Sequence, residues 1–231
     1  MKTTDLELET PAGKVGALLQ QPTDVQALYV FAHGAGANMR HAFMEQLATG
    51  LGRAGIATLR YDFPYMQRGA KRPDPPAVLE TTVRAAIDCG VELAGGKPVI
   101  AGGKSMGGRM TSNALARQPD DRVKGIAFVG FPLHQPGKPG IERAEHLARV
   151  TVPMLFLQGT RDTLADLDRI KAVCSALGER ATLHVIPDAD HSFVVRKRET
   201  GRSSEDVYRE LAATIADWTA RLGPGDYVTA R

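Results

Sequence analysis

Short apolar runs alternate with longer segments of helical periodicity along most of this chain. Val25–His33 and Ile56–Tyr61 are short and rich in β-branched and aromatic residues, which predicts buried strands. Val78–Leu93 carries apolar residues at helical spacing and stops at Gly95-Gly96, which predicts a helix. Strands separated by helices form a mostly parallel sheet with helices on both faces. The alternation therefore predicts an α/β fold that places ligands outside the carboxyl ends of its strands.

The other expected elements extend this alternation along the chain. A β-hairpin is expected first, at Leu6–Glu9 and Lys14–Gln20. Later strands are expected at Pro98–Ala101, Lys124–Gly130, Pro153–Leu157 and Ala181–Ile186. Helices are expected from a cap at Asn38 to Arg53 and at Ser105–Arg117, Thr163–Leu177 and Ser203–Arg221.

Two segments interrupt the pattern without dividing the chain. The Pro-rich segment Pro64–Pro76 is expected to be a loop, because proline excludes a central strand. Pro132–Thr151 is expected to be a short cap between two strands, with a helix over Ile141–Val150. No linker or internal repeat is found, so residues 1–231 are expected to form a single domain.

Composition excludes several classes of protein. Lys and Arg number 29 against 26 Asp and Glu, and this net charge of +3 is too even for a protein that coats nucleic acid. With 43% hydrophobic and 24% charged residues, the chain is neither disordered nor a membrane bundle. It shows no apolar run of signal-peptide or membrane-spanning length, so we expect a cytoplasmic protein with no membrane partner. Cys89 and Cys174 fall in expected helices, and we expect thiols rather than a disulfide or zinc site.

Gly103-Lys104-Ser105-Met106-Gly107 is the motif that points most directly to chemistry. It fits G-x-S-x-G, in which a serine lies on a sharp turn between a strand and a helix. The expected strand before it and the expected helix after it supply that context. Gly103-Lys104-Ser105 also matches the end of a phosphate-binding loop, but Pro98 stands where the first glycine of that loop belongs. The sequence therefore favours Ser105 as a nucleophile.

A nucleophilic serine needs a base that takes its proton and a carboxylate that orients the base. Asp162 follows the expected strand Pro153–Leu157, and His191 follows the next one, Ala181–Ile186. Both loops belong to the same edge of a parallel sheet as Ser105, so we expect the three side chains to form a catalytic triad. Four carboxylates are rivals of Asp162: Asp188 and Asp190, expected to shape the turn before His191, and Asp166 and Asp168, expected inside a helix.

Acyl transfer also needs backbone N–H groups aimed at the carbonyl oxygen that becomes negative. Met106, directly after the serine, is expected to supply one, and the glycine-rich loop after His33 the other. In that loop we assign the N–H of Ala35, with Gly36 as the alternative. Five residues are expected to line the substrate site: Gly34, Gly36, Phe63, Phe131 and His134. Arg68, Lys71, Arg72 and Lys138 lie on nearby loops and predict a solvated basic rim or, alternatively, an acidic substrate.

These residues resemble the α/β-hydrolase superfamily over nearly the whole chain. The resemblance rests on His33-Gly34, the turn Gly103–Gly107, Gly159-x-x-Asp162 and Asp190-His191. It implies an α/β-hydrolase fold with a central sheet of about seven or eight strands. The small size and short cap resemble the dienelactone-hydrolase-like group, whose own enzyme has a cysteine nucleophile. Gly102–Gly108, His33–Ala37 and Phe131–His134 are more similar to a narrower branch, which includes bacterial predicted hydrolases, a testis-expressed protein and a subunit of a chromatin-acetylating complex.

The residues and the resemblance together lead us to expect a serine hydrolase that cleaves a carboxylic ester or a related acyl bond through an acyl-enzyme. Its partner is expected to be a small-molecule acyl substrate, without nucleic acid, metal or organic cofactor. Two alternatives stay open. One is a binding or interaction module with little turnover on the same frame, and the other is a peptidase or thioesterase specificity on the same triad. The sequence leaves the substrate and the oligomeric state undetermined.

Overall fold

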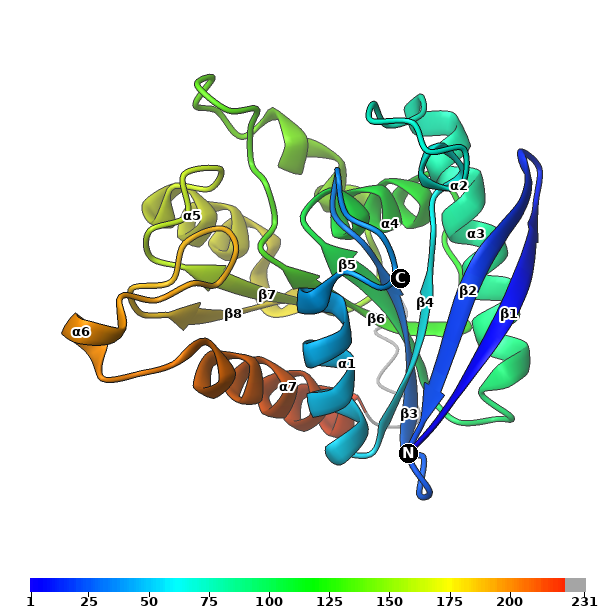
Figure 1. Ribbon diagram of the computed structural model, residues 1–231. Coiled ribbons are helices and arrows are strands. Elements are labelled where there is room, and N and C mark those ends of the chain that lie inside the picture. Colours follow the sequence, from blue (N-terminus) through cyan, green and yellow to red (C-terminus); the bar gives the residue numbers. More distant parts are fainter. Residues whose placement is uncertain (223–231) are drawn as a thin grey trace.

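The computed structural model describes residues 1–222, which form a sheet flanked by helices (Figure 1). Its strands are β1 (Lys2–Thr10), β2 (Gly13–Gln21), β3 (Ala27–Ala32), β4 (Ile56–Tyr61), β5 (Val99–Lys104), β6 (Val123–Val129), β7 (Met154–Gly159) and β8 (Ala181–Ile186). Its α-helices are α1 (Ala42–Arg53), α2 (Pro64–Gln67), α3 (Pro76–Leu93), α4 (Met106–Arg117), α5 (Leu167–Leu177), α6 (Lys197–Thr200) and α7 (Ser204–Arg221). Two 3-10 helices are η1 (Glu142–Arg149) and η2 (Gly178–Arg180).

The eight strands lie side by side in the order β1-β2-β4-β3-β5-β6-β7-β8. β1 and β2 form the expected hairpin, and β2 also runs antiparallel to β4. Every other pair of neighbours is parallel, which confirms the mostly parallel sheet predicted from the sequence. The chain adds β4 on one side of β3 and then crosses back to add β5 on the other. Ligands of open α/β sheets bind outside the strand ends at such a reversal.

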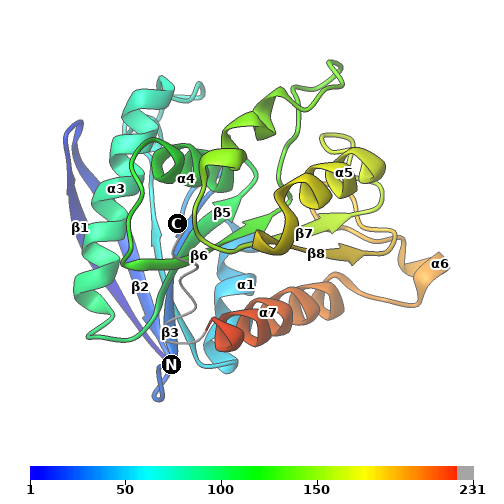
Figure 2. The same ribbon diagram turned by 180° about the vertical axis from the view of Figure 1, so that it is seen from behind.

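Helices cover both faces of the sheet, as opposite views in Figures 1 and 2 show. α1 and α7 pack together on one face, and α3, α4 and α5 lie on the other. β3 contributes to both cores because successive side chains of a strand point to opposite faces. Leu28 and Val30 pack beneath α3 and α4, whereas Tyr29 and Phe31 pack beneath α1 and α7. Each such burial contributes roughly 1.5–3 kcal/mol, so the central strands are almost entirely apolar.

The first turns of α5 and α7 are stabilised by side chains that accept otherwise unpaired N–H groups. At α7, Ser203 Oγ accepts from the N–H of Asp206, and the carboxylate of Asp206 accepts from the N–H of Ser203. At α5, Asp166 accepts from the N–H of Arg169. Asp166 therefore precedes its helix, and the expectation that it lies inside one is wrong.

The start of α1 also differs from the prediction. The helix begins after His41, whose ring Nδ1 accepts the N–H of Phe43 at 3.3 Å. Asn38, the expected cap, instead accepts from the N–H of Arg40 at 2.9 Å and closes a separate turn. Asparagine is favoured both at helix caps and in turns of this kind, so its presence alone does not fix the helix start.

Three further expectations need correction. β5 continues to Lys104, past two glycines that the sequence places after the strand. Only glycine fits at these two positions of the strand. A Cβ on Gly102 or Gly103 would clash with a carbonyl oxygen of a neighbouring strand. The expected loop at Pro64–Pro76 contains the short helix α2, and the expected helix in the cap is the 3-10 helix η1. Among residues 1–222, every helix is too short or too polar to span a lipid bilayer.

Candidate active site

The sharp turn at Ser105 connects β5 directly to α4. Ser105 adopts φ 50° and ψ −114°, a backbone conformation that residues other than glycine rarely occupy. Its N–H donates to the carbonyl of Val129 on the neighbouring strand at 3.1 Å. Gly107 lets α4 approach the end of β3, because a Cβ there would lie 2.5 Å from the carbonyl oxygen of Ala32. Backbone packing therefore holds the serine at the carboxyl edge of the sheet.

Three side chains from separate loops meet at this edge. Ser105 Oγ lies 2.8 Å from His191 Nε2, and His191 Nδ1 lies 2.7 Å from Asp162 Oδ2. A carboxylate can only accept, so Nδ1 carries the proton and Nε2 accepts from the serine hydroxyl. The structure thus brings together the three residues that the sequence predicts as a triad. Their connection is the one in which a histidine can take a proton from a serine.

The carboxylate of Asp162 is held by two further donors. Its Oδ1 accepts from the N–H of Leu164 at 2.8 Å, and its Oδ2 also accepts from the side-chain amide of Gln158. Gln158 is buried and in turn accepts the N–H of Phe131 at 3.1 Å. It thereby ties the acid to the loop after β6. Gln158 was not predicted from the sequence, although a lone amide in the apolar strand Met154–Gly159 is a signal that could have identified it.

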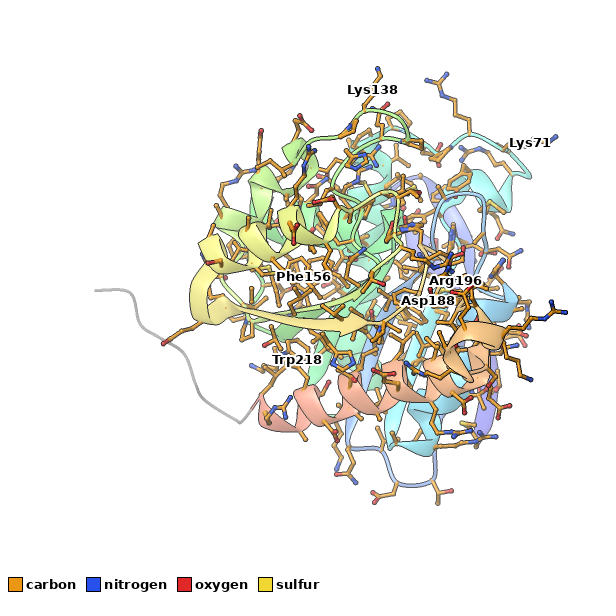
Figure 3. All side chains as sticks on the ribbon, turned by 90° about the vertical axis from the view of Figure 1, so that its left-hand side faces the viewer. Lys71, Lys138, Phe156, Asp188, Arg196 and Trp218 are labelled. Atoms are coloured by element: carbon orange, nitrogen blue, oxygen red, sulfur yellow. The ribbon has the colours of Figure 1, made fainter. Side chains whose placement is uncertain are left out.

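The four rival carboxylates have other partners. Asp188 pairs with Arg161 and Arg196, and Figure 3 shows Asp188 and Arg196 side by side. Asp190 Oδ1 accepts the N–H groups of Ser192 and Val194, so it shapes the turn around His191 as expected. The cap residue of α5, Asp166, and the exposed Asp168, which pairs with Lys171, have no bond to His191. Only Asp162 among these five carboxylates bonds the imidazole.

The glycine-rich loop after β3 is braced by His33. The ring Nδ1 donates to the carbonyl of Gly34 at 2.8 Å, and Nε2 accepts the N–H of Phe63 at 3.1 Å. Burial lowers the pKa of His33, which favours this neutral form. Because C=O and N–H point in opposite directions across a trans peptide, the N–H of Ala35 points away from His33.

Two N–H groups beside Ser105 have no acceptor among residues 1–222. They are those of Ala35 and of Met106, the first residue of α4. The N–H of Gly36, the alternative to Ala35, is instead donated to the hydroxyl of Tyr65 at 3.3 Å. The hydrogen bonds therefore favour Ala35 over Gly36 as the second donor, and the role itself stays a prediction.

The expected substrate-lining residues have mixed surroundings. Gly34 packs against the turn, since a Cβ on it would lie 3.7 Å from the Cβ of Ser105. Phe63 and Phe131 are completely enclosed by core side chains, with exposed fractions of 0% and 1%. His134 is buried as well, and its ring donates to the carbonyl of Gln135 at 2.8 Å. Burial leaves these three little surface of their own, and contact with a substrate stays a prediction for all the lining residues.

The four basic residues of the expected rim fall into two groups, one paired and the other exposed. Arg68 forms an ion pair with Asp74, which removes it as an unpaired cation. Lys71, Arg72 and Lys138 are exposed, and Figure 3 shows the labelled Lys71 and Lys138 extending outward from their loops. This arrangement fits a solvated rim.

One more contact at the site was not predicted. The side chain of Lys104 donates from Nζ to the backbone carbonyl of His191 at 2.7 Å. Lys104 belongs to the serine motif and to the rejected phosphate-loop match, and neither pattern predicts this contact. The two thiols, by contrast, lie where the sequence places them, on α3 and α5, and both are free.

Comparison with protein families identifies the family of the chain. A model described as an alpha/beta hydrolase domain matches residues 25–220. The chain therefore belongs to the alpha/beta hydrolase family.

Solved structures share the fold at low sequence identity. A serine hydrolase from Xanthomonas campestris, described as having no lid, is 20% identical with a TM-score of 0.73, over 94% of this chain and 95% of that chain. Dienelactone hydrolase from Anabaena variabilis is 22% identical with a TM-score of 0.73, over 95% of this chain and 97% of its own. Est1E from Butyrivibrio proteoclasticus is 17% identical with a TM-score of 0.70, over 94% and 99%.

Among curated proteins, the chain matches a protein of Mycobacterium tuberculosis that is provisionally named as a phosphoribosyl transferase. The two are 28% identical in an alignment 233 residues long, which covers 96% of this chain and 48% of the relative. The chain thus spans about half the length of the curated relatives it matches. Half of the relative lies outside the match, and its name does not say which half carries the named activity.

Proposed function

We propose that this protein is a serine hydrolase that cleaves a carboxylic ester or a related acyl bond of a small molecule. The observation that carries the proposal is the unbroken hydrogen-bonded path from Ser105 Oγ through His191 to Asp162. A buried carboxylate, an oriented imidazole and a serine on a strained turn form a combination that a binding module does not need.

In the first half of the reaction, Ser105 Oγ attacks the carbonyl carbon of the substrate. The hydroxyl proton moves to Nε2 of His191, and Asp162 stabilises the resulting imidazolium through Nδ1. The carbonyl oxygen becomes negative and accepts from the N–H groups of Ala35 and Met106. His191 then gives its proton to the leaving group, the bond to that group breaks, and an acyl ester on Ser105 is left.

In the second half, water takes the place of the serine hydroxyl. His191 removes a proton from the water, whose oxygen attacks the acyl carbon. The same two N–H groups hold the oxygen of this second tetrahedral intermediate. Its collapse returns the proton to Ser105 Oγ and releases the carboxylic acid, so the enzyme is regenerated without a further reactant.

The short cap Pro132–Thr151, of which only Glu142–Arg149 is helical, supports a small acyl substrate. The structurally similar Xanthomonas campestris hydrolase is described as lacking a lid, and Est1E shares the fold. A small cap leaves Ser105 close to solvent and suits small acyl groups.

The test compares wild-type protein with Ser105→Ala on short-chain nitrophenyl esters, a matched thioester and a matched anilide. We expect ester turnover in the wild type and a loss of at least about 10⁴-fold in the variant. Ser112→Ala is the matched control, because Ser112 on α4 also lies 2.7 Å from a histidine, His146, which forms no ion pair with a carboxylate among residues 1–222. A folded wild type that turns over none of the three acyl donors would contradict the proposal and favour an interaction module. Preference for the thioester or the anilide would assign the specificity differently on the same residues.

A further inference from the structure

We propose that Lys104 is a positioning residue for the catalytic base, because its ammonium holds the backbone of His191 and so keeps the imidazole aligned with Ser105. The proposal rests on the proposed function of the site. Lys104 touches neither Ser105 Oγ nor the imidazole nitrogens, so it acts through His191.

The hydrogen bond from Lys104 is a second link between the strand that precedes Ser105 and the loop that carries His191. Lys104 Nζ donates to the carbonyl of His191 at 2.7 Å, and among residues 1–222 that carbonyl accepts no other hydrogen bond. Lys104 directly precedes Ser105. The His191 loop is therefore held to β5 at two points, through its imidazole and through its main-chain carbonyl. Two contacts restrict rotation of the loop more than either one alone.

Two stacked phenylalanine rings, whose centres are 6.0 Å apart, lie beside the ammonium. Its nitrogen lies 5.9 Å from the ring centre of Phe43 on α1 and 5.7 Å from that of Phe193. Phe193 follows His191 by two residues, is completely buried, and adopts φ 61°. An ammonium near aromatic rings gains a cation–π attraction. Lys104 thus contacts the His191 loop at two points, the carbonyl of His191 and the ring of Phe193.

Gly130 lies close to the ammonium, and a side chain at this position would have little room. A Cβ on Gly130, in the turn after β6, would lie 3.2 Å from Lys104 Nζ and 3.5 Å from Cε1 of the His191 ring. Lysine and imidazole therefore border the same small volume. A Cβ at residue 130 would crowd the ammonium and reach ordinary contact with the imidazole.

The electrostatics favour a functional reason for this lysine. Burial, the largest cause, lowers the pKa of Lys104 to about 8, and the carboxylates of Asp162 and Asp190 offset part of that effect. No carboxylate lies within ion-pair distance of the ammonium among residues 1–222. A charged group in this environment opposes folding below pH 8, and the opposition fades as the pH rises toward the ordinary pKa of 10.5. Packing alone would be served better by methionine.

The same burial gives the proposal a pH signature. Asp162, Asp190 and His191 are the ionisable groups that face the ammonium from the loops after β7 and β8, and the facing residues of α1 and the β6 turn do not titrate. A hydrogen bond from an ammonium is roughly twice as strong as one from a neutral amine. Turnover should therefore decline as Lys104 loses its proton above pH 8.

The experiment compares wild type, Lys104→Met and Lys104→Arg, with Lys97→Met as the control. Lys97 is exposed and precedes β5 at the opposite end of the strand. We expect Lys104→Met to lower kcat by about 10- to 100-fold with KM within about 2-fold, since misplacement by 1 Å has effects of this size. Its melting temperature should equal or exceed that of the wild type. The decline above pH 8 should disappear in Lys104→Met and move to higher pH in Lys104→Arg.

A readout without turnover keeps this proposal separate from the proposed function. Hydrogen exchange of the backbone around residues 188–195 should be faster in Lys104→Met than in the wild type and unchanged in Lys97→Met. Equal exchange in all three proteins would overturn the positioning role, whether or not a substrate is found. So would a kcat of Lys104→Met within 2-fold of the wild type, or a reduced kcat that keeps the decline above pH 8. An inactive wild type with faster exchange in Lys104→Met would contradict the proposed function alone.

Discussion

The two loops that bring Ser105 and His191 together are stabilised in different ways. The serine turn is fixed by main-chain contacts, since Gly103 and Gly107 leave no room for a Cβ beside the carbonyl of Ala32. The His191 loop has backbone hydrogen bonds of its own, between Asp190 and Val194 and between Phe193 and Asp190, and side chains add further contacts. Asp190 accepts two N–H groups of the loop, and Lys104 donates to the carbonyl of His191.

This difference separates folding from activity. A side chain added to the serine turn displaces the backbone of two neighbouring strands, so the sheet itself is affected. A side chain removed from the His191 loop loosens one contact of several and leaves the sheet intact. We therefore expect substitutions of the turn glycines to act on stability, and substitutions in the loop to act on kcat.

Gly107→Ala should have the largest effect. Its Cβ would lie 2.5 Å from the carbonyl oxygen of Ala32 and 2.6 Å from that of His33, and neither backbone can move without disturbing β3. We expect a loss of at least about 3 kcal/mol in the free energy of unfolding, measured by urea denaturation.

Gly16→Ala is the matched control for this prediction. Its Cβ would meet the flexible end of Met39 at 3.0 Å, which can move aside. Equal free energies of unfolding for the two variants would contradict the claim that backbone packing holds the serine turn.

Asp162→Asn should leave the fold intact and reduce kcat by roughly 10⁴-fold. The amide can donate to Nδ1, so it stabilises the tautomer in which Nε2 no longer accepts the serine proton. Ester kinetics measure the loss, and circular dichroism checks the fold.

Asp166→Asn serves as the control in the same segment. Asparagine caps a helix as well as aspartate does, so α5 should persist and kcat should stay unchanged. An Asp162→Asn protein with wild-type kcat would mean that another group orients His191.

Asp190→Ala should have the smallest effect of the three. It removes the acceptor of the Ser192 and Val194 N–H groups, bonded at 2.8 Å and 3.0 Å, while the contact from Lys104 remains. We expect kcat to fall about 10-fold because His191 samples misaligned positions more often.

Asp190→Asn keeps an acceptor oxygen at the same place and should recover most of the activity. Steady-state kinetics of both variants decide the matter. If the asparagine variant were as slow as the alanine variant, the negative charge of Asp190, rather than its hydrogen bonds, would control the loop.

The same contrast explains what the sequence could reveal. The serine turn is a local pattern, because glycines two residues before and after Ser105 are required by close packing and are visible in one line of sequence. Asp162 and His191 could be placed because each follows a strand and parallel strands end at one edge. The parallel sheet followed from the alternation alone, and all these positions agree with the structure.

Contacts between distant segments could not be predicted in this way. Lys104 and His191 are separated by 87 residues, and Gln158 and Phe131 by 27, so no local pattern records either bond. The hydrogen bonds that favour Ala35 over Gly36 as the expected donor could not be predicted either, because only the folded chain places Tyr65 beside Gly36. The start of α1 was misplaced since Asn38 and His41 can both accept an N–H at a turn.

Labelling with a fluorophosphonate probe tests most directly whether Ser105 is an activated nucleophile. Wild-type protein and Ser105→Ala are treated with the probe, the adduct is counted by intact mass, and its position is found by peptide mapping. We expect one adduct per wild-type chain, on Ser105, and none on the variant. A folded wild type that stays unlabelled, or that carries the adduct on another residue, would contradict this expectation.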